Sequence, residues 1–402
     1  MMTTTTRAAD RRARAALSRL MEPSDWVGLA LVAAVGALDG LRIATGEVKP
    51  GPELQGELYR LLNREQSRSQ QGMLSEALQR WQPRVKDLDP DRDLATIERL
   101  GGNVLVPGDE SWPLALADLE LAEPLCLWIR GQYSGGIPPA ERTVALVGSR
   151  DSTNYGNSAT GDLAAGLTQK GYCVASGGAY GIDAQAHRSA LAAAEPGQWP
   201  ATVAIMACGL DRYYPAGNEE LLRTVASRGL LLSELPPGAA PTRWRFLQRN
   251  RLIAALAGTT VVVEARWRSG ALNTAHHAAG LGRPVGAVPG SIYSANSAGT
   301  HRLLRDGSAV CVTDAAEAAE LAGPLDAGAA AEQQAPLSDH DGLSVEDLLL
   351  LDALPVRQGT TVEKLSAVAG LPLRAVLAGL GRLEIMSLAQ QDSSGWRRQR
   401  RG

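Results

Sequence analysis

The chain has 402 residues, of which 45% are apolar, 21% charged and 4% aromatic, and its formal net charge is −3. This length allows two or three domains, and the composition is that of an ordinary globular protein. The net charge excludes a polycation, so any nucleic-acid site must be a local basic patch. None of the four cysteines forms a close pair in the sequence, so we expect no zinc or redox motif and a reducing, cytoplasmic environment.

Residues 1–100 are predicted to form a helical N-terminal domain, because apolar residues recur at helical spacing in 12–20, 26–38 and 52–62. The most hydrophobic stretch, 26–41, holds about 13 apolar residues before Asp39, short of the roughly 20 that a membrane span needs. We therefore expect a buried helix there, without a signal or an anchor. The polar segment 64–72 is predicted to be a surface connection, and 88–100 a capped helix.

From residue 101 onward, strands alternate with helices. Short strands are expected within 101–109 and 124–131, followed by 143–149, 171–176, 201–208, 229–234, 259–265, 284–290 and 309–312. Their apolar runs show no polar alternation, which is typical of strands buried on both faces. Strand–helix alternation at this spacing predicts an α/β fold with a doubly wound parallel sheet over 101–322.

The remainder of the chain is predicted to hold a linker and a third domain. Residues 323–343 are rich in alanine, glycine, proline and acidic residues, which is typical of a mobile linker. Residues 344–402 predict a helix, a helix–turn–helix with its turn at 370–372, a short strand and a basic tail. This order is that of a winged helix.

Candidate binding residues follow the strands, because ligands of parallel α/β sheets bind at the carboxyl ends of the strands. Gly148-Ser149-Arg150 follows the strand 143–149, and the stretch SGGAYGID begins at Ser176. Ser269-Gly270 and Pro289-Gly290 follow two later strands. Backbone N–H groups at helix N-termini attract anions, so this edge of the sheet is predicted to bind several phosphates.

A second candidate is a dense basic segment, in which the arginines and the interleaved aromatic residues are Arg243, Arg245, Arg249 and Arg251 with Trp244 and Phe246. Guanidinium groups match phosphate oxygens, and aromatic rings among them can stack on exposed bases. The alternative is a solvated charged loop that the two aromatic side chains anchor.

Enzymatic interpretations find less support. The chain contains no GxGxxG after its first parallel strand, no GxxxxGK[ST] and no GxSxG. Asp183 and His187 share a helical face and could act as acid and base, but a structural link that fixes the glycine loop is favoured. Glu264 is expected to cap a loop or to pair with an arginine. His276 and His277 lack a third ligand, so we expect no metal. With none of the enzyme motifs present, we also expect no cofactor and no catalytic residue.

Seven segments in series resemble the bacterial DNA-processing protein A (DprA) family over about residues 101–312. They are VALVGSR, SGGAYGIDAQAH, YYPAGNEELL, SELPPG, RFLQRNRLIAALAGTTVVVEARWRSGALNTA, GRPVGAVPG and SAGTHRLLRDG. The resemblance implies an extended Rossmann-like fold that binds single-stranded DNA as a homodimer. It also implies the loading of a RecA-type recombinase during natural transformation, an accessory winged helix, and no catalytic turnover.

The resemblance also implies which residues contact DNA. They are Gly148, Ser149, Arg150, Ser176, Gly177, Gly178, Gly181, Arg249, Asn250, Arg251, Ser269, Gly270, Pro289 and Gly290, to which the stacking argument above adds Phe246 as the fifteenth predicted contact. Phe246-Leu247-Gln248 departs from the Phe-Pro that the family commonly has there, which predicts a less rigid loop. Asn273 replaces a commonly apolar residue, and residues 1–100 lack a clear helix–hairpin–helix.

Two alternatives stay open at this point. One is a Rossmann-like nucleoside-monophosphate phosphoribohydrolase, although its PGGxGTxxE pattern is missing from the chain. The other is a protein-binding scaffold that acts through the winged helix, which would leave the arginine-rich edge of the sheet without a use.

Overall fold

We analysed a computed structural model of the chain, which describes residues 4–62, 72–131, 136–195, 199–323, 343–356 and 358–399. The chain divides into two compact units, Met1–Gly328 and Ala329–Gly402, and each is described by itself. The predicted connection at 64–72 and the predicted linker at 323–343 lie almost wholly outside the described residues. The predicted domain boundaries at 100 and 322 stay a prediction.

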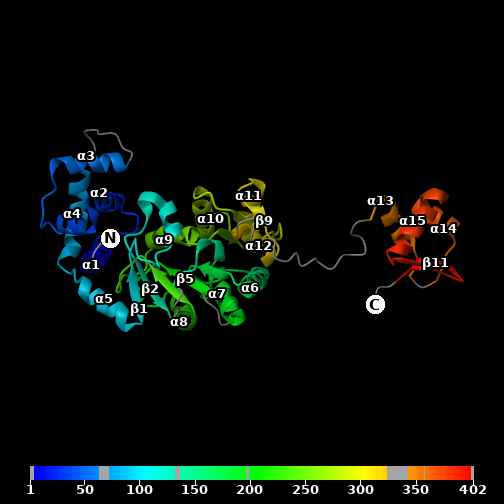
Figure 1. Ribbon diagram of the computed structural model, residues 1–402, viewed down its shortest axis with the longest axis horizontal. Coiled ribbons are helices and arrows are strands. Elements are labelled where there is room, and N and C mark those ends of the chain that lie inside the picture. The colour runs from blue at the N-terminus through cyan, green and yellow to red at the C-terminus, as the bar shows by residue number, and fades with distance from the viewer. Residues whose placement is uncertain are drawn as a thin grey trace. The chain divides into compact units, whose positions relative to one another are not determined.

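Five helices precede the sheet in the first unit, at the blue end of the colour ramp in Figure 1. Their bounds are α1 Thr4–Leu20, α2 Trp26–Ala44, α3 Pro52–Leu61, α4 Met73–Val85 and α5 Pro90–Arg99. Leu17, Leu31 and Trp81 are fully buried in the core that these helices share. Among the described helices, α2 is the single one that is long and apolar enough to cross a membrane by itself, and half of its apolar window is buried. The bent pair α14–α15 of the second unit passes the same test when taken together.

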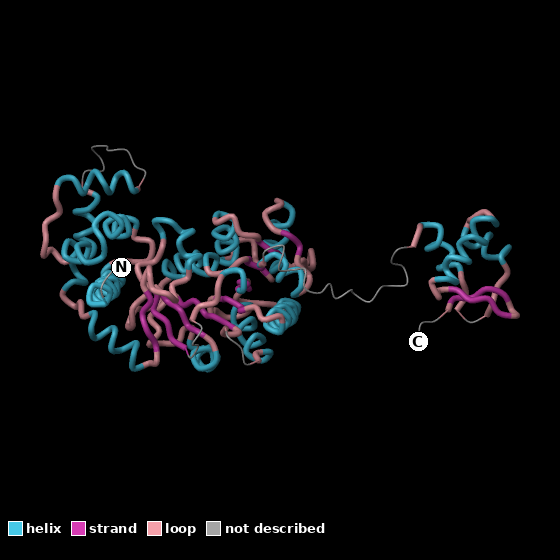
Figure 2. Tube along the Cα trace, viewed as in Figure 1, coloured by secondary structure: helices cyan, strands magenta, loops and turns pink. Residues whose placement is uncertain are grey.

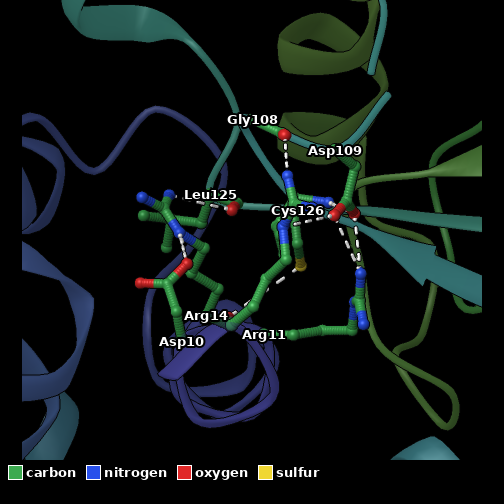
Figure 3. Close-up of polar contacts among 9 residues, drawn as sticks. Asp10, Arg11, Arg14, Gly108, Asp109, Leu125 and Cys126 are labelled. Carbon is green, nitrogen blue, oxygen red and sulfur yellow. Dashed lines mark hydrogen bonds and ion pairs between the residues drawn. The ribbon is translucent and has the colours of Figure 1, made fainter. Parts of the chain in front are cut away.

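Helix α1 is anchored on the first strands of the sheet by its arginines (Figure 3). Arg11 donates to both carboxylate oxygens of Asp109, at 2.8 and 3.0 Å, and the Asp109 side chain is 9% exposed. Arg7 donates to the carbonyl oxygen of Gly108, and Arg14 donates to Asp10 at 2.8 Å and to the carbonyl oxygen of Leu125 at 3.2 Å. The arginines of this helix therefore bind other groups of the same protein.

A nine-stranded sheet forms the centre of the first unit, in the order β1-β2-β6-β5-β4-β3-β7-β8-β9. The strands are β1 Gly102–Leu105, β2 Leu127–Gly131, β3 Thr143–Val147, β4 Cys173–Ser176, β5 Thr202–Met206, β6 Leu230–Ser233, β7 Thr259–Val262, β8 Val285–Ala287 and β9 Val310–Cys311. Strands β3 to β9 pair in parallel, whereas β2 is antiparallel to both β1 and β6. The predicted α/β fold with a mostly parallel sheet is confirmed.

Helices cover both faces of this sheet, as the tube drawing of Figure 2 shows. Ala145 and Val147 of β3 pack toward α9 (Arg243–Ala255) and α10 (Gly270–Gly280). Val144 and Leu146 point the other way and pack with the helices α6 Asn154–Gln169, α7 Ile182–Ala193 and α12 Ala315–Ala322. Because both alternating sets are apolar, the strands are continuous hydrophobic runs in the sequence.

The order of the strands creates a switch point between β3 and β7. From β3 the chain runs outward in one direction through β4, β5 and β6, and α9 then carries it back to β7, next to β3 on the opposite side. The loops after β3 and β7 therefore diverge above and below the sheet. Such a crevice outside the carboxyl ends of the strands is where open α/β sheets bind their ligands.

The described residues of the second unit form three helices and a hairpin. The elements are α13 Val345–Ala353, α14 Val362–Ala369, α15 Leu373–Ile385, β10 Ala389–Asp392 and β11 Gly395–Arg398. α14 ends at Gly370, whose φ is 65°, and α15 leaves at 103° to it. Leu350, Leu365 and Leu380 are buried in a separate core.

Candidate nucleic-acid interface

An open cleft of about 730 Å³ lies at the switch point. We call it the β3–β7 cleft, because residues 148–151 follow β3 and residues 266–274 follow β7 on its two sides. Helix α9 forms its floor through residues from Arg243 to Ile253. Ala179 and Tyr214 come from the loops after β4 and β5, and Asp183 comes from the first turn of α7. Of the fifteen predicted contact residues, eight line this cleft: Gly148, Ser149, Arg150, Phe246, Arg249, Asn250, Ser269 and Gly270.

Two loops are packed backbone against backbone beside the cleft. Ile182 donates its N–H to the carbonyl oxygen of Ser149 at 3.1 Å. Gly181 has a φ of 73°, and a Cβ atom there would collide with the carbonyl oxygens of Ser149 and Arg150. Only glycine combines this conformation with this approach. The third glycine of SGGAYGID therefore holds the loop after β3 in place.

Arg249 is the centre of the buried part of the site. Its side chain reaches from α9 under the loop after β4, where it donates to the carbonyl oxygens of Gly177, at 2.7 Å, and of Ile205. A Cβ atom on Gly177 would collide with this guanidinium, so Gly177 leaves room for Arg249. Burial, together with the charge of Arg150, lowers the pKa of Arg249 to about 10, against the charge of Asp183. Its Nε–H has no partner among the described residues.

Phe246 stands between two of the cleft arginines. The guanidinium carbon of Arg150 lies 5.2 Å from the centre of its ring, and that of Arg249 lies 5.7 Å from it. Tyr214 approaches the same ring with centroids 5.8 Å apart. Contacts of this kind hold an arginine in position while its N–H groups stay free to donate.

The cleft is rich in cations. Five arginines line it, against the two carboxylates of Asp151 and Asp183. Arg150, Arg243 and Arg268 form no ion pair within the described ranges, and all three are exposed. Arg266 instead pairs with Asp151 and donates to Asn296 at 2.8 Å. The hydrogen bond from Ser149 lowers the pKa of Asp151, and the charge of Arg266 acts in the same direction.

The start of α10 forms the opposite wall of the cleft. Ser269 caps this helix by accepting from the N–H of Ala271 at 3.3 Å, and Gly270 is exposed with open space around its Cα. Asn250 ties the wall to α9, because its amide donates to the carbonyl oxygen of Gly270 at 3.3 Å and to Asn273 at 3.1 Å. The asparagine at 273 therefore has a hydrogen-bonding partner across the wall.

Arg251 is not brought to the cleft. Its guanidinium is buried and donates to both oxygens of Glu234, at 2.7 and 2.8 Å, so its charge is already compensated inside the protein. Arg245 likewise pairs with Glu22, at 2.8 and 2.9 Å. Both arginines belong to α9, which begins at Arg243, so the segment that the sequence treats as a loop at 246–248 is helical. The departure at Phe246-Leu247-Gln248 thus lies within a helix and does not loosen a loop.

The remaining predicted contact residues also lie outside the lining of the cleft. Ser176 is buried and donates to the carbonyl oxygen of Leu146 at 2.6 Å. The carbonyl oxygen of Pro289 accepts from Tyr155, and that of Gly290 lies 2.9 Å from Nε2 of His301. These residues, with Gly177, Gly178, Gly181 and Arg251, are seven predicted contacts whose role toward DNA stays a prediction.

Asp183 and His187 do not form an acid–base pair in the structure. Asp183 accepts from the N–H of Ala179 at 3.3 Å, so the carboxylate already uses one amide of the glycine loop that is predicted to bind phosphate. His187 is fully buried, and its Nδ1 lies 2.7 Å from the hydroxyl of Thr202. Burial lowers the pKa of His187 to about 3.

Glu264 caps α6, because it accepts from the N–H of Thr153 at 2.9 Å.

Sequence reasoning missed two of the exposed cations. Arg266 and Arg268 line the cleft directly after β7, where the sequence pattern points to Ser269 and Gly270 instead. Their position in the sequence could have identified them, since both lie in a strand-to-helix turn at the carboxyl edge of the sheet. Trp244, by contrast, is exposed on α9 but does not line the cleft.

Comparisons with known proteins identify the family of the chain. Residues 103–323 match the family model described as DNA recombination-mediator protein A. The DNA processing protein DprA of Mycobacterium tuberculosis is 42% identical over 320 residues, which are 77% of this chain and 80% of that protein. The crystal structure of DprA from Streptococcus pneumoniae superposes with a TM-score of 0.52 at 29% identity, over 64% of this chain and 88% of that one.

A second solved structure is DprA from Helicobacter pylori, whose structure was described together with its binding of single-stranded DNA. It is 29% identical over 52% of this chain and 91% of that one, with a TM-score of 0.46. The matched family model covers more than half of the chain and includes every residue that lines the β3–β7 cleft. The chain belongs to the DprA family of DNA recombination mediators.

Proposed function

We propose that this protein binds single-stranded DNA in the β3–β7 cleft as a homodimer and loads a RecA-type recombinase onto the strand. The main evidence for DNA binding is a set of three exposed arginines that have no acidic partner in the described residues. They are Arg150, Arg243 and Arg268. They gather in one cleft of a chain whose net charge is negative. A flexible polyanion is the ligand that this distribution of charge fits.

The shape and chemistry of the cleft favour a single strand over a duplex. Phe246 presents a partly exposed aromatic ring among the guanidinium groups, and base–aromatic stacking requires bases that are not paired. The start of α10 adds backbone N–H groups at Gly270, where space is open for a phosphate. Homodimer formation and recombinase loading rest on the resemblance to the DprA family.

The function is one of binding without turnover. The two carboxylates of the cleft, Asp151 and Asp183, both accept hydrogen bonds from the protein, from Ser149 and Ala179 respectively. The family to which the chain belongs consists of DNA-processing proteins, which does not favour a phosphoribohydrolase.

We infer that the second unit is a winged helix with an accessory role. Three helices followed by an antiparallel hairpin support this, as does the crossing of α14 and α15 at 103°. Helix α15 offers few cations to a duplex, because Arg382 is paired with Asp347 at 2.7 Å. Its Leu373 and Leu377 are exposed one turn apart, which favours a protein contact.

The proposal is tested by titrating labelled oligothymidine at several salt concentrations. For Arg150→Ala and for Arg268→Ala, we expect weaker binding and a salt slope that falls by about 0.7 for each phosphate that the variant no longer neutralises. The matched control is Arg223→Ala, because Arg223 is exposed but paired with Glu219 outside the cleft. Equal affinities and slopes for all three variants and the wild type would remove the cleft as the DNA site.

A further inference from the structure

The turn after β7 carries an aromatic side chain that does not line the cleft. The N–H of Ser269 donates to the carbonyl oxygen of Arg266 at 3.1 Å, which closes a tight turn with Trp267 and Arg268 at its two central positions. Arg266 and Arg268 line the cleft, whereas the indole of Trp267 does not and is 54% exposed. Trp267 is therefore an exposed residue next to the cleft, between two residues that line it.

Neighbouring segments hold this turn in place. Ala265 donates its N–H to the carbonyl oxygen of Asn296 at 2.7 Å, and Gly299 donates its N–H to the carbonyl oxygen of Ala265 at 2.7 Å. The side chain of Asn296 accepts from Arg266 at 2.8 Å. A Cβ atom on Gly299 would lie 2.7 Å from that of Ala265, so α11 (Ala298–Arg305) is packed directly on the turn. A ligand that contacts the turn meets a surface that is already ordered.

The indole ring is also supported from one side. The guanidinium carbon of Arg302, on α11, lies 5.2 Å from the centre of the Trp267 ring. Arg302 is held in turn by Asp306, at 3.5 Å. An arginine over one face of an indole fixes its orientation and adds a positive charge beside it. With the side chain half exposed, ring surface remains open to a second planar group.

We propose that Trp267, backed by Arg302, is a stacking site for a nucleobase of the DNA strand where it leaves the β3–β7 cleft past the turn at 266–269. The inference rests on the proposed function and extends its binding site beyond the cleft. A nucleobase is the occupant because the adjacent Arg268 lines the cleft without an ion pair in the described residues and is therefore free to bind a phosphate of the strand. A base of that strand lies within reach of the adjacent ring, and every base has a face that stacks.

Substitution of the ring tests the proposal in the full-length protein. We expect Trp267→Ala to weaken binding of an oligothymidine by about 5- to 150-fold, the range of one base–aromatic stack. The salt slope should not change, because stacking releases no counterions. Trp267→Tyr keeps a ring and should stay within about threefold of wild type. Trp26→Ala is the control, since Trp26 is 49% exposed on α2, outside the cleft, and should have no effect.

An abasic scan identifies stacking directly. In wild type, removing the base at one position of the oligonucleotide should weaken binding, and in Trp267→Ala the same removal should have no further effect. Wild-type affinity of Trp267→Ala, or a set of abasic effects identical to that of wild type at every position of the oligonucleotide, would overturn the stacking site while leaving the cleft intact. An abasic effect at the position that stacks on Phe246 is expected in both proteins. A wild-type protein that binds no oligonucleotide would instead remove the proposed function together with this inference.

Discussion

At the scale of single residues, the glycines beside the cleft act by letting parts of the protein approach one another. Gly181→Ala adds a Cβ that meets the carbonyl oxygen of Arg150 at 2.7 Å, in a backbone with a φ of 73°. We expect it to lower the free energy of unfolding by about 2–4 kcal/mol through strain and overpacking, measured by urea denaturation. Gly280→Ala is the control, because its Cβ meets nothing within 4 Å and should be neutral or mildly stabilising. Equal stability of both variants would contradict this role.

The buried pair of Arg251 and Glu234 is expected to act on stability and not on DNA. Arg251→Met leaves Glu234 buried without its partner, which costs about 3–5 kcal/mol. Adding Glu234→Gln should restore part of this loss, because the uncompensated charge disappears. Thermal unfolding measures both variants, and Arg150→Ala, which removes an exposed side chain, should leave the melting temperature unchanged. A reduced salt slope of DNA binding in the stably folded double variant would show that Arg251 does contact the strand.

His187 makes stability depend on pH. Its pKa is about 3 in the folded protein, because burial disfavours the charged form, against 6.5 as its ordinary value. The unfolded chain therefore binds a proton first as pH falls, and the contribution of His187 to stability is lost between about pH 6.5 and 3. The expected slope is up to about 1.4 kcal/mol per pH unit. Urea denaturation of His187→Gln should give a flatter profile over this window, and an unchanged profile would contradict the assignment.

The contacts of individual residues are also what the sequence predicts least well. The sequence groups Arg249 and Arg251 as one phosphate-binding pair, yet residues two apart on a helix point about 200° away from each other. Arg249 accordingly reaches the cleft and Arg251 reaches Glu234. A prediction that α9 begins at Arg243 would have separated them. Nothing in the sequence, however, indicates that the carbonyl oxygens of Gly177 and Ile205 accept from Arg249.

At the scale of elements, the strands of the parallel sheet were predictable because each is a short apolar run between turns. All seven expected members of that series, from 143–149 to 309–312, contain an observed strand. Their order in the sheet, and the antiparallel pairing of β1 and β2, depend on long-range contacts that periodicity does not encode. The cleft could therefore be placed at the carboxyl ends of the strands, but not assigned to the gap between β3 and β7.

Helix α1 is expected to depend on one carboxylate for its attachment to the sheet. Asp109 accepts from Arg11 and from the N–H of Val106, at 2.9 Å, so Asp109→Ala removes hydrogen bonds within the loop and to the helix together. We expect a loss of about 2–3 kcal/mol, together with faster hydrogen exchange in Thr4–Leu20. Asp91→Ala is the control, because its pair with Arg12 is exposed and contributes little. Unchanged exchange in α1 after Asp109→Ala would show that apolar packing alone holds the helix.

At the scale of the whole molecule, the cleft and the exposed leucines of α15 belong to different compact units. Every residue that lines the β3–β7 cleft lies between Val147 and Thr274, within the unit Met1–Gly328. The second unit has its own core around Leu350 and Leu380, and its helix α15 exposes Leu373 and Leu377 beside Arg374. If the proposed function is right, we therefore expect strand binding to belong to the first unit and the second unit to serve a different partner.

A chain that ends at Gly328 tests this division. It keeps the complete cleft, so we expect its affinity for oligothymidine and its salt slope to match those of the full chain within error. The basic residues near the C-terminus would add counterion release if they touched the strand, and their removal would then lower the slope by about 0.7 for each phosphate that they neutralise. An unchanged slope assigns the strand to the first unit alone. A slope that falls by about 0.7 or more would place part of the DNA path on the second unit.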